Sequence, residues 1–240
     1  MKSRLIIIGD SFATPSNDGN FYGKIIEERY NDARVQWYGM PSRDAQSVLD
    51  IWTKLAAVLN ENDSLVVVLP AFSRTRLPIA KEKWETSNIF DGEISLTNRF
   101  IGTSSYIKDT RFEIEFFGNV FERDYYESIL HPQSVINSSK ASEANYFEII
   151  HALKKLTKAN TYVFTWTEID CDEDLLHDKR AVEKELGIWE TLQDLFRKGE
   201  GEDHWWHDEH WSVNTHYAFA KFLIKRFKLD YKFEMKTKIL

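Results

Sequence analysis

Two short motifs, one near each end of the chain, carry the residue types that serine-based acyl chemistry requires. Ser11 follows the apolar run of residues 5–8 and the pair Gly9-Asp10. Asp208 and His210 stand two residues apart in a polar, Trp-rich segment that could fold beside Ser11. A serine nucleophile needs an imidazole to accept its proton and a carboxylate to fix the imidazole tautomer. The two motifs together could supply all three groups.

The residues around Ser11 also suggest where it lies in the fold. Four consecutive apolar residues predict a strand buried on both faces, as in a parallel sheet. Gly9 permits an abrupt turn at the carboxyl end of that strand, where open α/β sheets bind their ligands. Gly, Asp and Ser are also ordinary turn residues. Ser11 taken alone therefore fits a turn or helix-capping serine as well as a nucleophile.

The segment around His210 contains further candidates for each role. The competing bases are His204, His207 and His216, and the competing acids are Asp203 and Glu209. Imidazole and carboxylate groups also bind zinc, but their spacing here does not match His-Glu-x-x-His, so we expect no metal site. Trp205 and Trp206 could form a wall of a substrate site or pack within their own loop.

The scaffold that must position these residues is predicted to be an α/β domain. Strands are predicted at 5–8, 35–38, 65–69, 112–117 and 161–166, and helices at 22–29, 44–59, 122–130, 141–156, 178–196 (broken near Gly187) and 214–227. Alternating strands and helices in the first 70 residues indicate a parallel sheet. From 71 to 119 no period is sustained, which exceeds an ordinary connection. We predict one domain, 1–240, with an insertion at about 71–145 over the top of the sheet.

The order of the motifs resembles that of the SGNH (GDSL) hydrolase family. Gly9-Asp10-Ser11 matches the first block of the family, and the last block is similar to Asp208-Glu209-His210-Trp211 with His216 six residues after His210. Most members have Asp-x-x-His-Pro there. This chain has His207 in the place of that Asp, and is closer to the Asp-x-His-Trp variant of SGNH-like proteins that process O-acetylated polysaccharides.

The resemblance implies a fold and a set of roles. The fold would be a three-layer α/β/α sandwich of flavodoxin-like topology around a central parallel sheet. Ser11 would be the nucleophile, with its own backbone N–H in the oxyanion hole. His210 would be the base, and Asp208 would orient it.

The family's middle blocks, which complete the oxyanion hole, match less well. Gly39 occupies the place of the second-block glycine, although Ser42 or Arg43 could present the N–H instead. The third block, normally Gly-x-Asn-Asp, is absent, and Ser73 or Arg74 could replace its Asn. One such donor stabilises the transition state by about 2.7–4 kcal/mol, so its absence bears on the turnover rate.

These observations predict a serine esterase that needs no cofactor. The expected substrate is a small-molecule or glycan ester, such as an O-acetyl group on a carbohydrate. Candidate substrate-binding residues are Arg74, Trp205, Trp206 and Trp211, although Arg74 and Arg76 could simply be solvated. The alternatives are a non-catalytic ligand-binding module on the same fold, an O-acyltransferase, and a metal-dependent hydrolase that uses the histidine cluster.

Composition narrows the possible partners and location. The 240 residues carry a formal net charge of −7, a field that does not favour nucleic acid. No apolar run approaches the roughly 20 residues that cross a bilayer, and the amino end does not resemble a cleaved signal. The single cysteine, Cys171, cannot form an intrachain disulfide. We expect a cytoplasmic protein without a membrane partner, and the oligomeric state stays open.

Overall fold

The structure is a computed structural model of the 240-residue chain. It describes residues 3–15, 21–31, 34–40, 43–78, 81, 85–89, 94–98, 100–103, 113–116, 119–122, 131–137, 139–165, 169, 171–187, 211 and 213–235.

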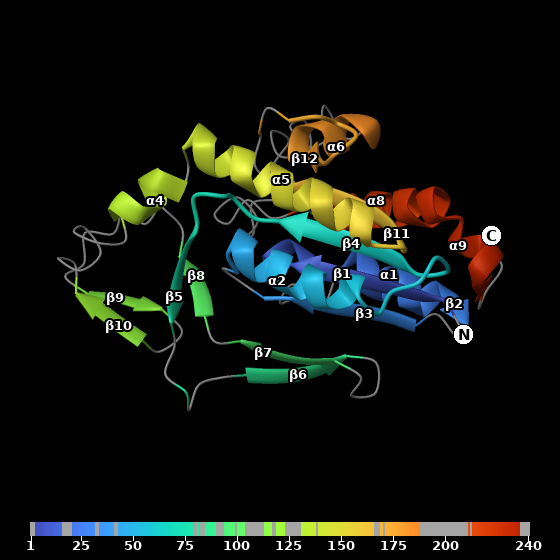
Figure 1. Ribbon diagram of the computed structural model, residues 1–240. Coiled ribbons are helices and arrows are strands. Elements are labelled where there is room, and N and C mark those ends of the chain that lie inside the picture. Colours follow the sequence, from blue (N-terminus) through green and yellow to red (C-terminus); the bar gives the residue numbers. More distant parts are fainter. Residues whose placement is uncertain are drawn as a thin grey trace, which may run out of the picture.

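A five-stranded parallel sheet forms the centre of the molecule (Figure 1). Its strand order is β12-β11-β4-β1-β3, which in chain order of these five strands is 2-1-3-4-5 read from the β3 edge. This is the flavodoxin-like doubly wound order. The strands are β1 (Arg4–Gly9), β3 (Arg34–Gly39), β4 (Ser64–Leu69), β11 (Asn160–Thr165) and β12 (His177–Asp178).

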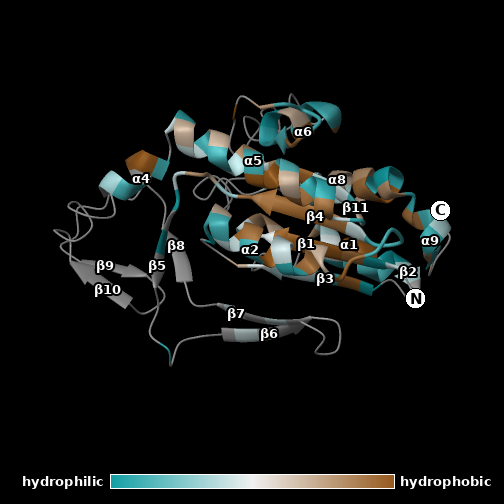
Figure 2. Cartoon of the chain, viewed as in Figure 1, coloured by the Kyte–Doolittle hydropathy of each residue, from teal (hydrophilic) through white to brown (hydrophobic). Residues whose placement is uncertain are grey.

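Helices cover both faces of this sheet because side chains alternate along each strand. Leu5 and Ile7 of β1 pack toward α1 (Tyr22–Arg29) and α8 (Val213–Phe227). Ile6 and Ile8 pack on the other face, toward α2 (Ala45–Ala56) and α5 (Lys140–Leu156). Every residue of β1 and β4 is buried, and Figure 2 shows the hydrophobic colours concentrated there. The predicted three-layer α/β/α fold is confirmed.

Shorter elements complete the described part of this core. They are the 3-10 turn η1 (Ser11–Ala13), β2 (Tyr30–Asn31), α6 (Lys179–Glu185), α9 (Leu229–Lys232) and β13 (Glu234–Met235), which pairs with β2. The Asp178 carboxylate accepts the Ala181 N–H at 2.7 Å and so starts α6. Gly187, with a left-handed φ of 68°, follows the end of α6, where the sequence predicts a break.

The segment predicted as an insertion contains antiparallel strand pairs. The pairs are β5 (Thr75–Pro78) with β8 (Phe100–Thr103), β6 (Glu85–Ile89) with β7 (Ile94–Asn98), and β9 (Glu113–Phe116) with β10 (Asn119–Glu122), followed by α4 (His131–Asn137). Figure 1 shows β5–β8 and β9–β10 beyond the end of β4 and β6–β7 below β3 in the view. The strand predicted at 112–117 is confirmed as β9. The helix predicted at 122–130 is wrong at its first residue, since Glu122 ends β10, and its remaining residues lie outside the described part.

Candidate active site

The Ser11 turn begins directly after β1 and is held by its own preceding residue. The Asp10 carboxylate accepts the Phe12 N–H at 3.1 Å, and the Asp10 carbonyl accepts the Ala13 N–H at 3.0 Å. Asp10 is fully buried, whereas Ser11 is partly exposed. The Asp10 carboxylate therefore stabilises the turn itself, and Ser11 stays partly exposed at the carboxyl end of β1.

Gly9 allows this turn to approach the neighbouring strand closely. A Cβ at Gly9 would lie 2.6 Å from both the Cβ and the carbonyl oxygen of Val68, and 2.9 Å from the Cβ of Ala13. No other residue fits there without displacing β4 or the turn. Glycine at this position brings the ends of β1 and β4 together.

The ends of β1 and β4 are where a binding crevice is expected. In this strand order the connections diverge between the first and third strands, which are β1 and β4 here, and ligands bind at that switch point. Arg74, in the loop after β4, donates to the Asp10 carboxylate at 3.2 Å and to the Arg43 carbonyl at 3.1 Å. The segments predicted to supply the nucleophile and the replacement for Asn are thus in direct contact.

The Asp10–Arg74 ion pair is largely withdrawn from solvent. The Arg74 side chain is 11% exposed and the Asp10 side chain is fully buried. Burial lowers the pKa of Arg74, and the Asp10 carboxylate opposes that shift. Arg74 therefore holds the Ser11 turn through Asp10, a structural role that differs from its predicted role in substrate binding.

A second arginine joins the ends of β1 and β3. The buried Arg43 guanidinium donates to the carbonyl oxygens of Gly9, at 3.4 Å, and Tyr38. These bonds satisfy carbonyl groups at the strand ends. Arg43 contributes to the site by fixing its backbone.

The network of polar contacts at these strand ends continues to the start of α2 and to β5, the first strand of the predicted insertion. Asp44 caps α2 by accepting the Ser47 N–H at 3.0 Å. Arg76, on β5, donates to Asp44 at 3.3 Å and to Asp50 at 3.0 Å. These ion pairs attach β5 to α2 beside the candidate site, so Arg76 is not a freely solvated arginine.

Gly39 has a packing role that the sequence did not predict. A Cβ at Gly39 would lie 2.3 Å from the carbonyl carbon of Ala13 and 2.6 Å from the backbone nitrogen of Thr14. The chain leaving the Ser11 turn thus packs directly on the end of β3. Its role as an oxyanion donor stays a prediction, as does that of the partly exposed Ser73 in the turn after β4.

Trp211 belongs to the core, so its predicted role in substrate binding is corrected. Its side chain is 2% exposed and stacks on Phe164 with ring centroids 5.6 Å apart. Its indole N–H donates to the buried Glu183 at 3.2 Å, and its ring meets the edge of Phe12 at 5.8 Å. A ring enclosed on these sides cannot line an open substrate surface. Trp211 instead joins the carboxyl-terminal motif to the residue after Ser11.

His216, one of the competing bases, is also packed in this core. It lies in α8, 5% exposed, and its ring stacks on Tyr22 at 5.8 Å. Burial, and then the nearby Asp10 carboxylate, raise the pKa of Tyr22 well above its usual range, so Tyr22 is a neutral phenol. His216 therefore has a packing role behind the Ser11 turn.

Several predicted site residues lie outside the described part of the chain. They are Ser42, Trp205, Trp206, Asp208 and His210. Their roles stay predictions, and so does the histidine cluster around 204–210. Within the described ranges, no three His, Cys, Asp or Glu residues gather as metal ligands. None of the helices in those ranges is long and apolar enough to cross a membrane.

Comparison with known proteins adds no family to these observations. The chain matches no protein-family model, and a search of curated proteins finds no similar sequence. The resemblance to SGNH hydrolases therefore stays a prediction from the two sequence motifs.

Proposed function

We propose that the chain is a serine ester hydrolase of the SGNH type, with Ser11 as nucleophile, His210 as base and Asp208 as the acid that orients it. The best support is the contact between Trp211 and Phe12, whose ring centroids are 5.8 Å apart. His210 directly precedes Trp211, and Ser11 directly precedes Phe12. Each proposed catalytic residue is thus bonded to one member of the same aromatic contact, which supports a site formed by the two motifs.

The reaction would proceed in two balanced halves. The Ser11 oxygen attacks the ester carbonyl carbon as His210 accepts the hydroxyl proton, and collapse of the tetrahedral adduct expels the alcohol, which takes that proton. Water then attacks the acyl-enzyme with His210 again as base. The acid leaves, and His210 returns the proton to Ser11.

The negative oxygen formed in each half would be stabilised by donors at the ends of three strands. Preorganised N–H groups aimed at such an oxygen are a large part of catalysis. The candidates are the backbone N–H groups of Ser11 and Gly39 or Ser42, with Ser73 or Arg74 in the place of the family's Asn. The buried Arg43 guanidinium adds a positive charge at the ends of β1 and β3, whereas the charge of Arg74 is offset by Asp10.

The proposed substrate is a small acyl group, such as acetyl, on a carbohydrate hydroxyl. The Asp208-x-His210-Trp211 spacing supports this class, as it resembles the variant block of proteins that process O-acetylated polysaccharides. Release of acetate from an O-acetylated polysaccharide would test it. If the acetyl group instead appeared on an added sugar acceptor, the reaction would be acyl transfer, since the same acyl-enzyme can react with water or with a sugar hydroxyl.

The catalytic roles can be tested on an activated ester, 4-nitrophenyl acetate. Ser11→Ala and His210→Gln should each lower kcat by about a thousandfold or more, because members of such a triad act as a unit. Ser95→Ala and His151→Gln change exposed residues of the same types and should leave kcat unchanged. Equal activity of Ser11→Ala and Ser95→Ala would contradict the proposal.

A non-catalytic binding module on this fold is the second candidate. It is favoured by the Asp10–Arg74 pair, since a committed arginine stands where the family has its Asn donor. This candidate predicts a folded protein that binds an acetylated glycan with the same affinity in the wild type and in Ser11→Ala, and hydrolyses nothing.

A further inference from the structure

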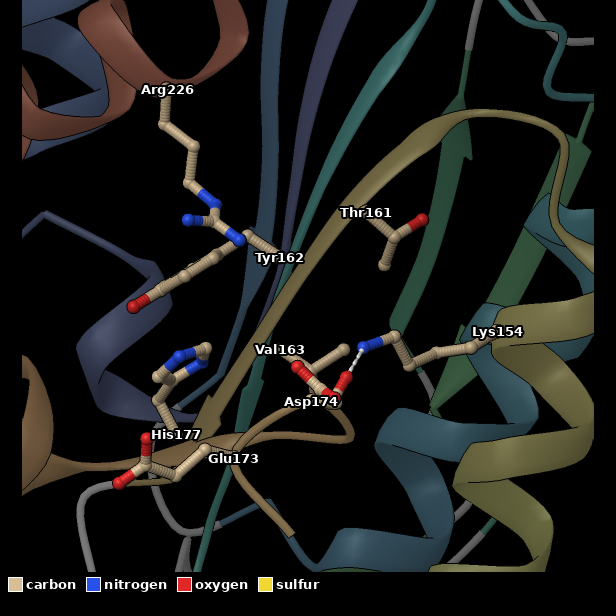
Figure 3. A pocket seen from close by; sticks show the side chains of 8 residues that line it. All are labelled: Lys154, Thr161, Tyr162, Val163, Glu173, Asp174, His177 and Arg226. Atoms are coloured by element: carbon tan, nitrogen blue, oxygen red, sulfur yellow. Dashed lines mark hydrogen bonds between the residues drawn. The ribbon is translucent and has the colours of Figure 1, made fainter.

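A polar cavity lies on the outer edge of the sheet, apart from the Ser11 turn. Its volume is about 280 Å³, and it opens beside β11, between α5, α8 and the segment that leads into β12. Figure 3 shows the side chains that line it. The size is just below the roughly 300–1,000 Å³ of sites for drug-sized ligands, so it suits a smaller molecule.

The edge of β11 presents unpaired backbone groups to this cavity. β12 pairs with β11 only at Phe164 and Thr165. The Asn160 N–H donates to the Asp63 carbonyl, on the β4 side. Since alternate residues of a parallel strand bond to opposite neighbours, the backbone groups of Thr161 and Val163 face outward. The described residues thus leave an acceptor, the Thr161 carbonyl, and a donor, the Val163 N–H, on either side of Tyr162.

An arginine lies over an aromatic ring at one end of the cavity. The Arg226 guanidinium lies 4.6 Å from the centre of the Tyr162 ring, and Tyr162 stacks on His177 at 5.1 Å and 19°. Within the described ranges Arg226 makes no hydrogen bond. A guanidinium preorganised on an aromatic ring in this way is suited to bind a carboxylate with its planar set of donors.

The other charged residues that line the cavity include both cations and anions. Lys154 donates from its ammonium group to the carbonyl oxygens of Asp174 and Leu175, the latter at 3.0 Å. Glu173 and Asp174 line the cavity as well, and Figure 3 shows Glu173 beside His177, at the other end of the ring stack from Arg226. A purely anionic ligand would meet these carboxylates, whereas a ligand with both charges would not be repelled.

We propose that this cavity binds a free α-amino acid. Its ammonium group would donate to the Thr161 carbonyl and face Glu173 or Asp174, and its carboxylate would accept from the Val163 N–H and Arg226. These are the two backbone bonds that one residue of a neighbouring parallel strand would make across from Tyr162. The site does not use Ser11 and stands independently of the esterase proposal.

The binding test is an NMR titration of the ¹⁵N-labelled protein, followed at the Val163 amide and the His177 ring. The probes are L-alanine, L-glutamate, L-lysine and L-phenylalanine. At least one should give saturable shifts at both positions, and its N-acetyl and carboxamide derivatives, which each lack one charge, should bind at least about tenfold more weakly. Absence of saturable shifts with all four would overturn the proposal.

Arg226→Gln and Lys225→Gln form a matched pair for this test. Both remove one positive charge from the last turn of α8, but only Arg226 lines the cavity. Arg226→Gln should lower the affinity for the amino acid by about tenfold or more, and Lys225→Gln should leave that affinity unchanged. Thermal unfolding checks that both variants fold, and an equal effect of the two contradicts the site.

A different result would assign another ligand to the outer side of β11. A blocked tripeptide that binds where none of the free amino acids does would show that β11 accepts an added peptide strand. That result also overturns the amino-acid proposal.

Discussion

Two charged regions, one at the carboxyl ends of β1 and β4 and one along the outer side of β11, use their arginines in opposite ways. At the ends of β1 and β4, Arg74 is nearly buried and paired with the fully buried Asp10. At the outer edge of β11, the exposed Arg226 is held by the Tyr162 ring. In the first region the charge of Arg74 stabilises the backbone turn that carries Ser11. The second keeps a positioned charge at the mouth of a cavity, where a ligand can reach it.

The largest expected difference between the two regions is in stability. Arg74→Met should lower the free energy of unfolding by about 3–5 kcal/mol, because the buried Asp10 carboxylate would lose its ion pair with Arg74. Arg226→Met should lower it by only about 0.5–1 kcal/mol, the usual worth of an exposed cation–π contact. Urea unfolding of both variants measures this, and equal losses would erase the contrast.

Trp211 provides a sharper test of the region around Ser11. Trp211→Phe removes the N–H that Glu183 accepts, and Trp52→Phe removes the N–H that donates to Thr157 at 2.8 Å on the other face of the sheet. Each should lower the free energy of unfolding by about 1–3 kcal/mol. Only Trp211→Phe should also lower kcat, by about tenfold or more, since it alone adjoins His210 and Phe12.

Steady-state kinetics with 4-nitrophenyl acetate separates these two tryptophans. If both variants lose the same stability and retain the same kcat, Trp211 is only a core residue, and the contact with Phe12 no longer supports the triad.

The smallest expected effect concerns His177 at the outer edge. Burial lowers the pKa of His177 from its usual value, and the Arg226 and Lys154 cations lower it further, while the Glu185 and Glu173 carboxylates oppose them. The neutral ring therefore favours the folded state. Its contribution is present above pH about 6.5 and is lost as the pH falls through the lowered folded-state pKa. Arg226→Met should raise this pKa toward its usual value.

An NMR titration of the His177 ring protons measures the shift in the wild type and in Arg226→Met. A His177 pKa at or above the usual value in the wild type would show that the ring is not held neutral. An unchanged pKa in the variant would show that Arg226 does not act on the His177 ring.

The sheet was predictable because its strands and helices carry strong local patterns. The apolar runs in β1 and β4 require burial on both faces, and α2 combines an amphipathic period with the Asp44 cap. The pairs β5–β8 and β6–β7 were not predicted. Glu85–Ile89 has four polar residues before its single apolar one, and the alternation in Ile94–Asn98 covers only the four residues Ile94 to Thr97, too short to predict a strand firmly.

The candidate site was predictable only in part, for a similar reason. Ser11 was placed correctly at a strand end, since a glycine after a buried strand marks that position. The Asp10–Arg74 pair joins residues 64 positions apart, and it depends on β4 being the neighbour of β1. The burial of Trp211 depends on Phe12, Phe164 and Glu183, which come from three separate elements. Residue types alone could not reveal either arrangement.

The central claim, that Ser11 is a nucleophile activated by His210, is tested most directly by covalent labelling. The folded protein is treated with a fluorophosphonate at neutral pH, digested and mapped by mass spectrometry. The adduct should lie on Ser11, and it should be lost in Ser11→Ala and strongly slowed in His210→Gln. An unlabelled Ser11 in folded protein, or labelling that is the same in wild type and Ser11→Ala, would contradict the claim.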